Sequence, residues 1–236
     1  MKPFIVGAIF ARGGSKSIPK KNVKSFCGKP LMAYAIQTAQ AVPSIERLIV
    51  STDDRGIAAV ARRYGAEVPF LRPKRLATDH SPELLSWKHA VDALEKLWGR
   101  KIDILVSIPT TSPLRTAQDI EKCIKKLLQS KADVVITARE AQRNPYFNML
   151  TVDASGYARL VVSPKKAVSR RQQAPNVYDV TTVAYAVRGP YLKRAAALLR
   201  GKVKTVIIPQ ERAWDIDTPL DFEIAQFLMR RRKRTK

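Results

Sequence analysis

The sequence predicts an α/β fold built on a doubly wound, mostly parallel sheet, and two patterns support this. Short apolar runs rich in branched residues alternate along the chain with segments that have the periodicity of amphipathic helices. The alternation lapses once, over residues 141–178, where prolines interrupt it and where we expect an inserted, hairpin-bearing arm. The 236 residues then form a single domain that contains the arm and ends in a basic tail, residues 230–236.

The first expected strand is Phe4–Phe10, a continuous apolar run that suits a strand buried on both faces. A loop follows it, and Pro30 stands at the first position of a helix, Leu31–Ala41. Thr116 and Asp119 have the spacing of a capping box for a later helix. The remaining elements of this part are strands at Leu48–Val50, Val68–Leu71, Ile102–Ile108 and Val134–Thr137, and helices at Ile57–Tyr64, Leu84–Leu97 and Ile120–Leu128.

Within the arm, the sequence predicts two weak strands, Phe147–Val152 and Arg159–Val162. The regular pattern resumes beyond the arm, and Thr218 is the expected N-cap of a final helix that has Pro219 at its first position. The elements expected between the arm and this last helix are a strand at Val180–Val187, a helix at Tyr191–Leu199 and a strand at Val203–Ile208.

The composition excludes several classes of protein. Two cysteines, Cys27 and Cys123, cannot form a disulfide framework, so a reducing, cytoplasmic location is expected. No stretch approaches the ~18 apolar residues of a membrane span. The net charge of +23 implies acidic partners. However, only 7% of residues are aromatic and no RNA or DNA motif is present, so the sequence disfavours a nucleic-acid-binding protein.

The segment directly after the first strand, ARGGSKSIPKKN, is the first candidate site. Its paired glycines allow close approach of the backbone to a phosphate, while Arg12, Lys16 and Lys21 can neutralise the charge. The first 45 residues contain seven Lys or Arg and no acidic residue, which also favours a phosphate-rich ligand. The spacing is neither GxxxxGK[ST] nor GxGxxG, and a solvated basic turn is the alternative.

Asp215 and Asp217 are a candidate metal site. Two residues apart in an extended segment, their side chains lie on the same side, with Cα atoms ~6.6 Å apart. Two such carboxylates can share a hard divalent cation with phosphate oxygens and water. The alternative is that they only stabilise a helix N-terminus. Of the two histidines, His89 is expected to pack within a helix, while for His80 a place in a nucleotide site stays open.

These motifs, in their order along the chain, resemble those of the CMP-nonulosonate synthetases, the acylneuraminate or N-acetylneuraminate cytidylyltransferase family. That family activates sialic acid and related nine-carbon acidic sugars with CTP, on a Rossmann-like nucleotidyltransferase fold. The resemblance extends over nearly the whole chain. It rests on ARGGSKSIPKKN (11–22), GKPL (28–31), VSTD (50–53), FLRP (70–73), LATDHS (76–81), TSPLR (111–115), RRQ (170–172) and DID (215–217).

The resemblance implies attack of the sugar's anomeric hydroxyl on the α-phosphorus of CTP, with Mg²⁺ (or Mn²⁺) and release of pyrophosphate. It assigns catalytic roles to Arg12, Lys21 and Arg171. The nucleotide-binding residues would be Arg12, Gly13, Ser15, Lys16, Lys21, Asn22, Arg72 and Ser81. Asp215 and Asp217 would bind the metal ion.

The arm is basic, with Lys165, Lys166, Arg170 and Arg171, and by itself is as consistent with a solvated loop as with a site. In the family, an equivalent arm mediates dimerisation and delivers basic residues to the neighbouring subunit. The resemblance therefore implies a homodimer in which Arg170, Arg171 and Gln172 contact the acidic sugar.

The sequence departs from the family pattern on the acceptor side. Many members have Gln where this chain has Pro109, and Asn-Gly where it has Thr181-Thr182. Loss of hydrogen-bonding groups changes the selection of hydroxyl and amide patterns. The acceptor therefore stays open among N-acetylneuraminate, legionaminic, pseudaminic and Kdo-like 3-deoxy-ulosonic acids. A nucleotidyltransferase that uses UTP or GTP on a sugar phosphate is a further alternative.

Overall fold

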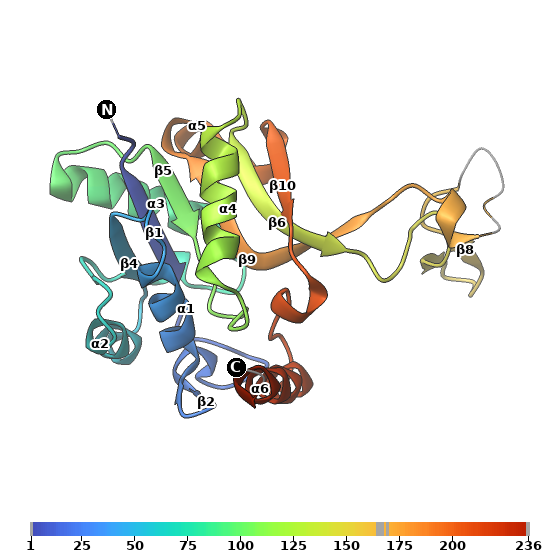
Figure 1. Cartoon of the computed structure of the whole chain (residues 1–236), viewed down its shortest axis with the longest axis horizontal. Coiled ribbons are helices and arrows are strands. Elements are labelled where there is room, and N and C mark those ends of the chain that lie inside the picture. Colours follow the sequence, from blue (N-terminus) through green and yellow to red (C-terminus); the bar gives the residue numbers. More distant parts are fainter. Residues whose placement is uncertain (1, 164–167, 169, 235–236) are drawn as a thin grey trace.

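The computed structural model describes residues 2–163, 168 and 170–234 of the chain. Its centre is a six-stranded sheet in the order β10-β6-β9-β5-β1-β4 (Figure 1). Strand β9 is antiparallel to both of its neighbours, and the other five strands share one direction. The strands are β1 (Ile5–Phe10), β4 (Arg47–Ser51), β5 (Ile104–Ser107), β6 (Val134–Glu140), β9 (Tyr178–Arg188) and β10 (Val203–Ile207). The mostly parallel α/β fold is confirmed.

Helices cover both faces of the sheet, because consecutive side chains of a strand point to opposite faces. In β1, Ile5 and Ile9 pack into one core with α1, α2 and α4, while Val6 and Ala8 pack into a second core with α3 and α5. These helices are α1 (Leu31–Gln40), α2 (Arg55–Arg63), α3 (Glu83–Trp98), α4 (Ala117–Leu128) and α5 (Gly189–Arg194). Such two-sided burial explains why the central strands are continuous apolar runs.

A third core joins the last helix to the first loop. Helix α6 (Pro219–Arg234) packs Phe222, Ala225 and Met229 against Phe26 and Leu31. Phe26 lies in a small two-stranded ribbon, β2 (Ser25–Phe26) with β3 (Lys29–Pro30), which the sequence did not predict. In Figure 1, α6 and β2 accordingly lie together at the bottom of the molecule, so the two ends of the chain's regular structure meet beside the loop that follows β1.

The chain between β6 and β9 leaves the sheet and projects to the right in Figure 1. The two predicted arm strands are present in shorter form, as the antiparallel hairpin of β7 (Leu150–Val152) and β8 (Ala158–Leu160). Lys165 and Lys166 lie outside the described residues, as do the last two residues of the tail. The rest of the tail differs from the expected solvated extension because residues 230–234 continue helix α6.

Two predicted elements were wrong. Val68–Leu71 is not a strand: only the isolated bridges of Glu67 to Ile49 and of Leu71 to Thr52 connect this stretch to the sheet. Pro69 explains this, because proline has no N–H to donate to a strand ladder.

The helix expected at Tyr191–Leu199 is also interrupted. Helix α5 ends at Arg194, and a separate 3₁₀ turn forms at Leu198–Arg200. The Tyr191 hydroxyl lies 3.0 Å from the Ala197 carbonyl oxygen and 3.1 Å from that of Leu198, and satisfies these acceptors outside a helix. Gly189 starts α5 where no side chain fits, since a Cβ there would lie 1.9 Å from the Ile102 carbonyl oxygen.

Candidate active site

The basic loop begins where β1 ends, at the carboxyl edge of the parallel strands, the edge at which α/β proteins bind ligands. The N–H of Gly13 donates to Asp53 Oδ1 over 3.1 Å. A Cβ on Gly13 would lie 3.0 Å from Asp54 Oδ2, so glycine allows this close approach. Asn22 Nδ2 donates to the Arg12 carbonyl oxygen over 3.0 Å. The backbone of the loop is therefore held in place by these two hydrogen bonds.

Two of the loop's cations meet a single carboxylate. Arg12 Nη1 lies 2.5 Å from Asp79 Oδ1, and Lys16 Nζ lies 2.7 Å from Asp79 Oδ2. Hydrogen bonds from Lys16 and Arg12 lower the pKa of Asp79. A phosphate group has the same charge sign and the same acceptor chemistry as this carboxylate. It would therefore compete with Asp79 for both cations.

A first cavity, of about 250 Å³, opens beside this ion-paired cluster. Arg72 Nε and Ser81 Oγ are buried there without a hydrogen-bond partner among the described residues. Burial lowers the pKa of Arg72, and the negative charge of Asp53 opposes that shift. Unpaired buried donors indicate a place for a polar ligand. The cavity is lined by Phe10, Arg12, Arg72, Leu76, Thr78, Asp79, Ser81, Glu83 and Ser86.

A second cavity, also of about 250 Å³, shares Phe10, Arg12 and Glu83 with the first. Its lining residues are Phe10, Arg12, Ser15, Lys21, Asn22, Glu83, Pro109, Thr110, Thr111, Thr182 and Tyr185. The two cavities together contain Arg12, Ser15, Lys21, Asn22, Arg72 and Ser81 of the predicted nucleotide residues. Gly13 and Lys16 belong to the same loop but line neither cavity. The positions that depart from the family pattern, Pro109 and Thr182, face the second cavity.

The carboxylate segment near the C-terminus is tied to this second cavity. Lys21 Nζ donates to the Ile216 carbonyl oxygen over 2.7 Å and lies 4.0 Å from Asp217 Oδ1. The N–H of Ile216 donates to the Thr111 carbonyl oxygen over 2.9 Å. Residues almost 200 positions apart in the sequence thus meet through one lysine and one backbone hydrogen bond.

The carboxylate oxygens of Asp215 and Asp217 are ligands that suit a divalent cation. Asp215 Oδ1 is buried without a hydrogen-bond partner in the described part of the chain. Burial, together with the negative charge of Asp215, raises the pKa of Asp217, and the positive charge of Lys21 only partly opposes this shift. The helix α6 cap is formed instead by Thr218 and Asp221, whose side chains each accept from the other's backbone N–H.

The described residues contain no cluster of three or more His, Cys, Asp or Glu placed to hold a metal ion. Two carboxylates are nevertheless sufficient where Mg²⁺ takes its other ligands from phosphate and water.

Arg115 connects the segment that carries Pro109 to strand β9 through hydrogen bonds. Its fully buried guanidinium donates to the Pro109 carbonyl oxygen and, over 3.0 Å, to that of Thr182. Burial lowers the pKa of Arg115 to about 9, and the negative charge of Asp215 opposes the shift. The hydroxyls of Ser112 and Thr182 lie 2.6 Å apart. The Thr111–Arg115 turn is therefore fixed to β9 by polar contacts.

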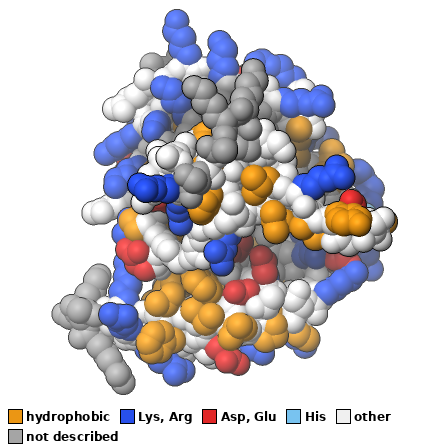
Figure 2. All heavy atoms as spheres, turned by 90° about the vertical axis from the view of Figure 1, so that its right-hand side faces the viewer, with side chains coloured by type: hydrophobic (Ala, Val, Ile, Leu, Met, Phe, Trp, Pro, Cys, Tyr) orange, Lys and Arg blue, Asp and Glu red, His pale blue; other side chains and the backbone are white. Residues whose placement is uncertain are grey.

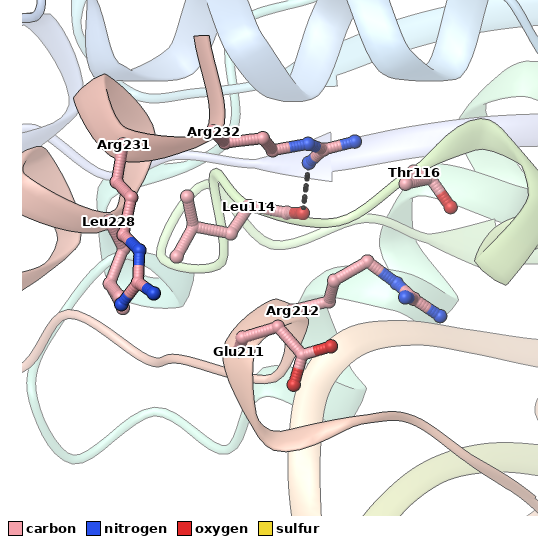
Figure 3. Close-up of a pocket in the computed structure, with 7 residues that line it drawn as sticks. All are labelled: Leu114, Thr116, Glu211, Arg212, Leu228, Arg231 and Arg232. Atoms are coloured by element: carbon pink, nitrogen blue, oxygen red, sulfur yellow. Dashed lines mark hydrogen bonds between the residues drawn. The ribbon is translucent and has the colours of Figure 1, made fainter. Parts of the chain in front are cut away.

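A further cavity, of about 470 Å³, lies behind that turn (Figure 3). Arg232 of α6 donates to the Leu114 carbonyl oxygen over 2.8 Å. Arg212 forms two hydrogen bonds with the buried carboxylate of Asp119, at 3.0 and 3.1 Å. Arg232 therefore contacts the turn itself, and Arg212 contacts the first turn of α4, which follows it. This cavity contains none of the predicted site residues, and its lining residues are Leu114, Thr116, Glu211, Arg212, Leu228, Arg231 and Arg232.

Within one chain, the structure does not bring the arm residues to the loop. Arg171 and Gln172 line a separate cavity of about 190 Å³ at the base of the arm. There Arg171 Nη2 donates to the Ala141 carbonyl oxygen over 2.6 Å. Arg170 is exposed and precedes the 3₁₀ turn at Arg171–Gln173. Their predicted contact with a sugar stays a prediction.

The structure also shows residues that the sequence reasoning did not identify. The residues in question line the cavities: Asp79 the first, Tyr185 the second and Glu83 both. Asp79 directly precedes His80, for which the sequence left a place in the nucleotide site open. His80 itself is exposed and lines neither cavity. His89 packs edge-on against Phe70, with ring centroids 5.1 Å apart, as expected for a packing residue. Asp79 and Glu83 belong to no motif that marks a carboxylate as a partner of cations or of a neutral ligand group, so the sequence gives no signal for them.

The surface does not favour a nucleic-acid interface on the face that carries the arm. Figure 2 shows Lys and Arg side chains scattered over that face with acidic and hydrophobic groups between them, and the described side chains that are visible there form no continuous basic stripe. None of the helices in the described ranges is long and apolar enough to cross a membrane.

Comparison with known proteins identifies the family. The sequence pattern of the family described as Cytidylyltransferase matches residues 6–219. The chain is 32% identical over 225 residues to a CMP-N,N'-diacetyllegionaminic acid synthase from Campylobacter jejuni, covering 95% of this chain and 94% of the relative. A post-translational flagellin modification protein B from Campylobacter coli is 31% identical, with 96% and 95% covered.

Solved structures show the same fold at lower identity. A CMP:2-keto-3-deoxy-manno-octonic acid synthetase in complex with CTP superimposes with a TM-score of 0.71 at 17% identity, covering 97% of this chain and 99% of that one. A 4-diphosphocytidyl-2C-methyl-D-erythritol synthase from Anaerococcus prevotii gives a TM-score of 0.68, also at 17% identity, with 97% of each chain covered. These structures show the fold, and the match of the family pattern together with the Campylobacter relatives shows that the chain belongs to the cytidylyltransferase family of nucleotidyltransferase enzymes.

Proposed function

We propose that this enzyme transfers the cytidylyl group of CTP to a nonulosonic acid and releases pyrophosphate. The observation that carries the proposal is the junction at Lys21. This residue of the basic loop lines the second cavity and donates to the backbone carbonyl between Asp215 and Asp217, which connects the cations of the loop to the carboxylate pair. The relatives named for legionaminic acid support the acceptor class.

In this proposal the nucleoside of CTP binds in the first cavity and the acceptor sugar binds in the second. Arg72 and Ser81, with unpaired donor atoms, line the cavity that suits the nucleoside. Arg12, Ser15 and Lys21 border the path of the triphosphate. Negative charge accumulates on the bridging and non-bridging oxygens as pyrophosphate leaves, and cations already in place stabilise it. Arg12 and Lys21 are thus the proposed catalytic cations.

Asp215 and Asp217 would hold the Mg²⁺ (or Mn²⁺) ion. A bound divalent cation would neutralise phosphate charge and orient the oxygens of the reacting group. The residues' own part is to keep two acceptor oxygens beside the second cavity, with Lys21 fixing the backbone between them.

The acceptor is expected in the second cavity, where Thr110, Thr111 and Thr182 supply hydroxyl groups. Sugar acids of this class present hydroxyls and amides that such side chains can bind. Legionaminic acid is the first choice, and pseudaminic and N-acylneuraminic acids are the next, since relatives of 28% identity are named for those two. A Kdo-like acid is the alternative.

We further propose a homodimer formed through the arm. Leu150, Val152 and Tyr157 of the hairpin are 59%, 67% and 71% exposed, an unusual density of exposed apolar side chains on so short a ribbon. In such a dimer, Arg171 would reach the partner's acceptor, where its planar fork suits a carboxylate. The unpaired thiols of Cys27 and Cys123 support a reducing, cytoplasmic location.

One assay tests the reaction. Pyrophosphate release is measured with each of the four ribonucleoside triphosphates and Mg²⁺ against a panel of nonulosonic acids, Kdo-type acids and sugar phosphates, and the product is identified by mass spectrometry. We expect turnover with CTP and a nonulosonic acid only. Turnover with UTP or GTP and a sugar phosphate, or none with CTP and any acid, would refute the proposal.

A further inference from the structure

Glu83 is the one carboxylate, among the described residues, that lines both cavities of the site. It is the first residue of α3, and the residue as a whole is exposed. Its carboxylate nevertheless turns toward the protein, because Oε1 accepts a hydrogen bond from Trp87 Nε1 over 3.1 Å. The dipole of α3 would stabilise a glutamate at this position, but the dipole does not explain why the side chain borders two cavities.

Trp87 holds this carboxylate in place. Its indole is 3% exposed and stacks on Phe10, with ring centroids 5.9 Å apart and planes at 29°. Its ring centroid also lies 5.7 Å from that of Tyr185. Phe10 and Tyr185 both line the second cavity. Trp87, which donates the hydrogen bond to Glu83, is thus packed into the wall of the site. Its fixed position limits how far the Glu83 carboxylate can move.

The surroundings decide which part of a nucleotide Glu83 faces. The carboxylate is electrostatically coupled to Arg72, which lines only the first cavity, and to Tyr185, which lines only the second. A phosphate would be repelled by a carboxylate and belongs with Arg12 and Lys21. On the proposed function, the base occupies the first cavity and the triphosphate follows the loop. The ribose is the segment that joins them and passes the shared wall.

We propose that Glu83 accepts hydrogen bonds from the ribose hydroxyls of CTP and makes the enzyme select ribonucleotides over deoxyribonucleotides. A carboxylate only accepts, and a vicinal diol offers two donors, so the chemistry is complementary. The same pairing recurs in dinucleotide-binding folds, where an acidic residue binds the ribose 2′-hydroxyl. The inference rests on the proposed use of CTP and assigns the nucleotide's sugar, which the family assignment does not.

Binding measurements without acceptor test this directly. Calorimetric titration gives Kd values of wild-type protein, Glu83→Gln and the control Glu223→Gln for CTP, 2′-deoxy-CTP and 3′-deoxy-CTP. Glu223 is an exposed glutamate of α6, outside both cavities. We expect the wild type and the control to bind CTP at least tenfold more tightly than one or both deoxy analogues, because hydrogen bonds to charged groups are strong.

In Glu83→Gln, CTP affinity should fall to within about threefold of the analogues, with their affinities little changed. Three outcomes would overturn the inference about the ribose without refuting the proposed function. They are an unaltered CTP preference in Glu83→Gln, an equal loss of affinity for all three nucleotides, and no preference for CTP in the wild type. A wild type that binds none of the three nucleotides would instead refute the proposed function. Unchanged melting temperatures confirm that the variants fold.

Discussion

At the scale of single residues, the site consists of charged groups whose partners are only partly supplied by the protein. Arg72 Nε, Ser81 Oγ and Asp215 Oδ1 are buried without partners among the described residues. Native proteins pair nearly all such groups, and a polar ligand bound at the candidate site could supply partners for these three. Two acidic residues lie near these groups, Asp79 and Asp217. We expect replacement of Asp217 to lower turnover and replacement of Asp79 to strengthen nucleotide binding.

Replacement of Asp217 by Asn should lower turnover by about two orders of magnitude and leave the fold intact. The side chain is 74% exposed and makes no packing contribution, so melting temperature should change by no more than about 2 °C. Steady-state kinetics over a Mg²⁺ titration give the measurement, and Asp92→Asn on the exposed face of α3 is the control. A Mg²⁺ dependence identical to that of wild type would exclude Asp217 as a ligand.

Replacement of Asp79 by Asn should strengthen triphosphate binding. The carboxylate pairs with Arg12 and Lys16, and a nucleotide must replace those contacts. Without the competing charge, we expect the Kd for CTP and for pyrophosphate to fall by about two- to fivefold, with a weaker effect at high salt, where exposed pairs are screened. Weaker binding in the variant would show that Asp79 holds the loop in its binding conformation instead.

At the scale of elements, hydrogen bonds at the ends of helices α4 and α6 connect segments that are remote in sequence to the site. Helix α4 begins with the predicted capping box of Thr116 and Asp119, and Arg212 adds two hydrogen bonds to the same buried carboxylate. Helix α6 continues through the basic tail, and its Arg232 binds the turn that carries Thr111. A charge cluster that looks solvated in the sequence is thus partly structural.

The Asp119 carboxylate should make stability depend on pH. Burial raises its pKa, but hydrogen bonds from Arg212 and Thr116 outweigh burial, and the pKa in the folded protein lies below its usual value. A depressed pKa contributes stability above the unfolded value of about 4, and that stability is lost as pH falls through the folded value. Asp119→Asn should therefore reduce the free energy of unfolding by about 2 kcal/mol at pH 7.

The difference between wild type and Asp119→Asn should shrink as the pH falls below about 4. Urea unfolding at pH 7, 5, 4 and 3.5 measures it, with Glu223→Gln as the matched surface control. A difference that stays constant down to the lowest pH would mean that shape, and not charge, is what the variant loses.

At the scale of the whole molecule, the arm decides whether one chain is sufficient. Arg171 lines a cavity at the base of the arm, apart from the loop of the same chain. The exposed apolar hairpin beyond it suits an interface with a second copy.

Arg171→Ala should therefore lower turnover with the sugar acid by at least tenfold. Mixing this variant with inactive Asp217→Asn should restore activity, because a mixed dimer would contain one site with both residues intact. Activity is measured after subunit exchange, and the dimer is monitored by light scattering. Absence of rescue in verified mixed dimers would place Arg171's role within its own chain.

Much of the fold could be predicted because it depends on local patterns. The alternation of apolar runs and helical segments, the capping box at Thr116 and the proline at the start of the last helix act within a few residues of sequence. The failures were at Val68–Leu71, where Pro69 prevents ladder pairing, and beyond α5, where the Tyr191 side chain competes for the backbone.

By itself, the sequence determined the sheet, the basic loop and the carboxylate pair, since short-range periodicity and residue chemistry specify each of them. Only the tertiary structure decided that Lys21 meets Ile216, that Asp79 pairs with two cations of the loop and that Glu83 borders both cavities. These relations join residues from about 60 to about 195 positions apart. They follow from the packing of whole elements, and no local pattern records how distant elements are placed against one another.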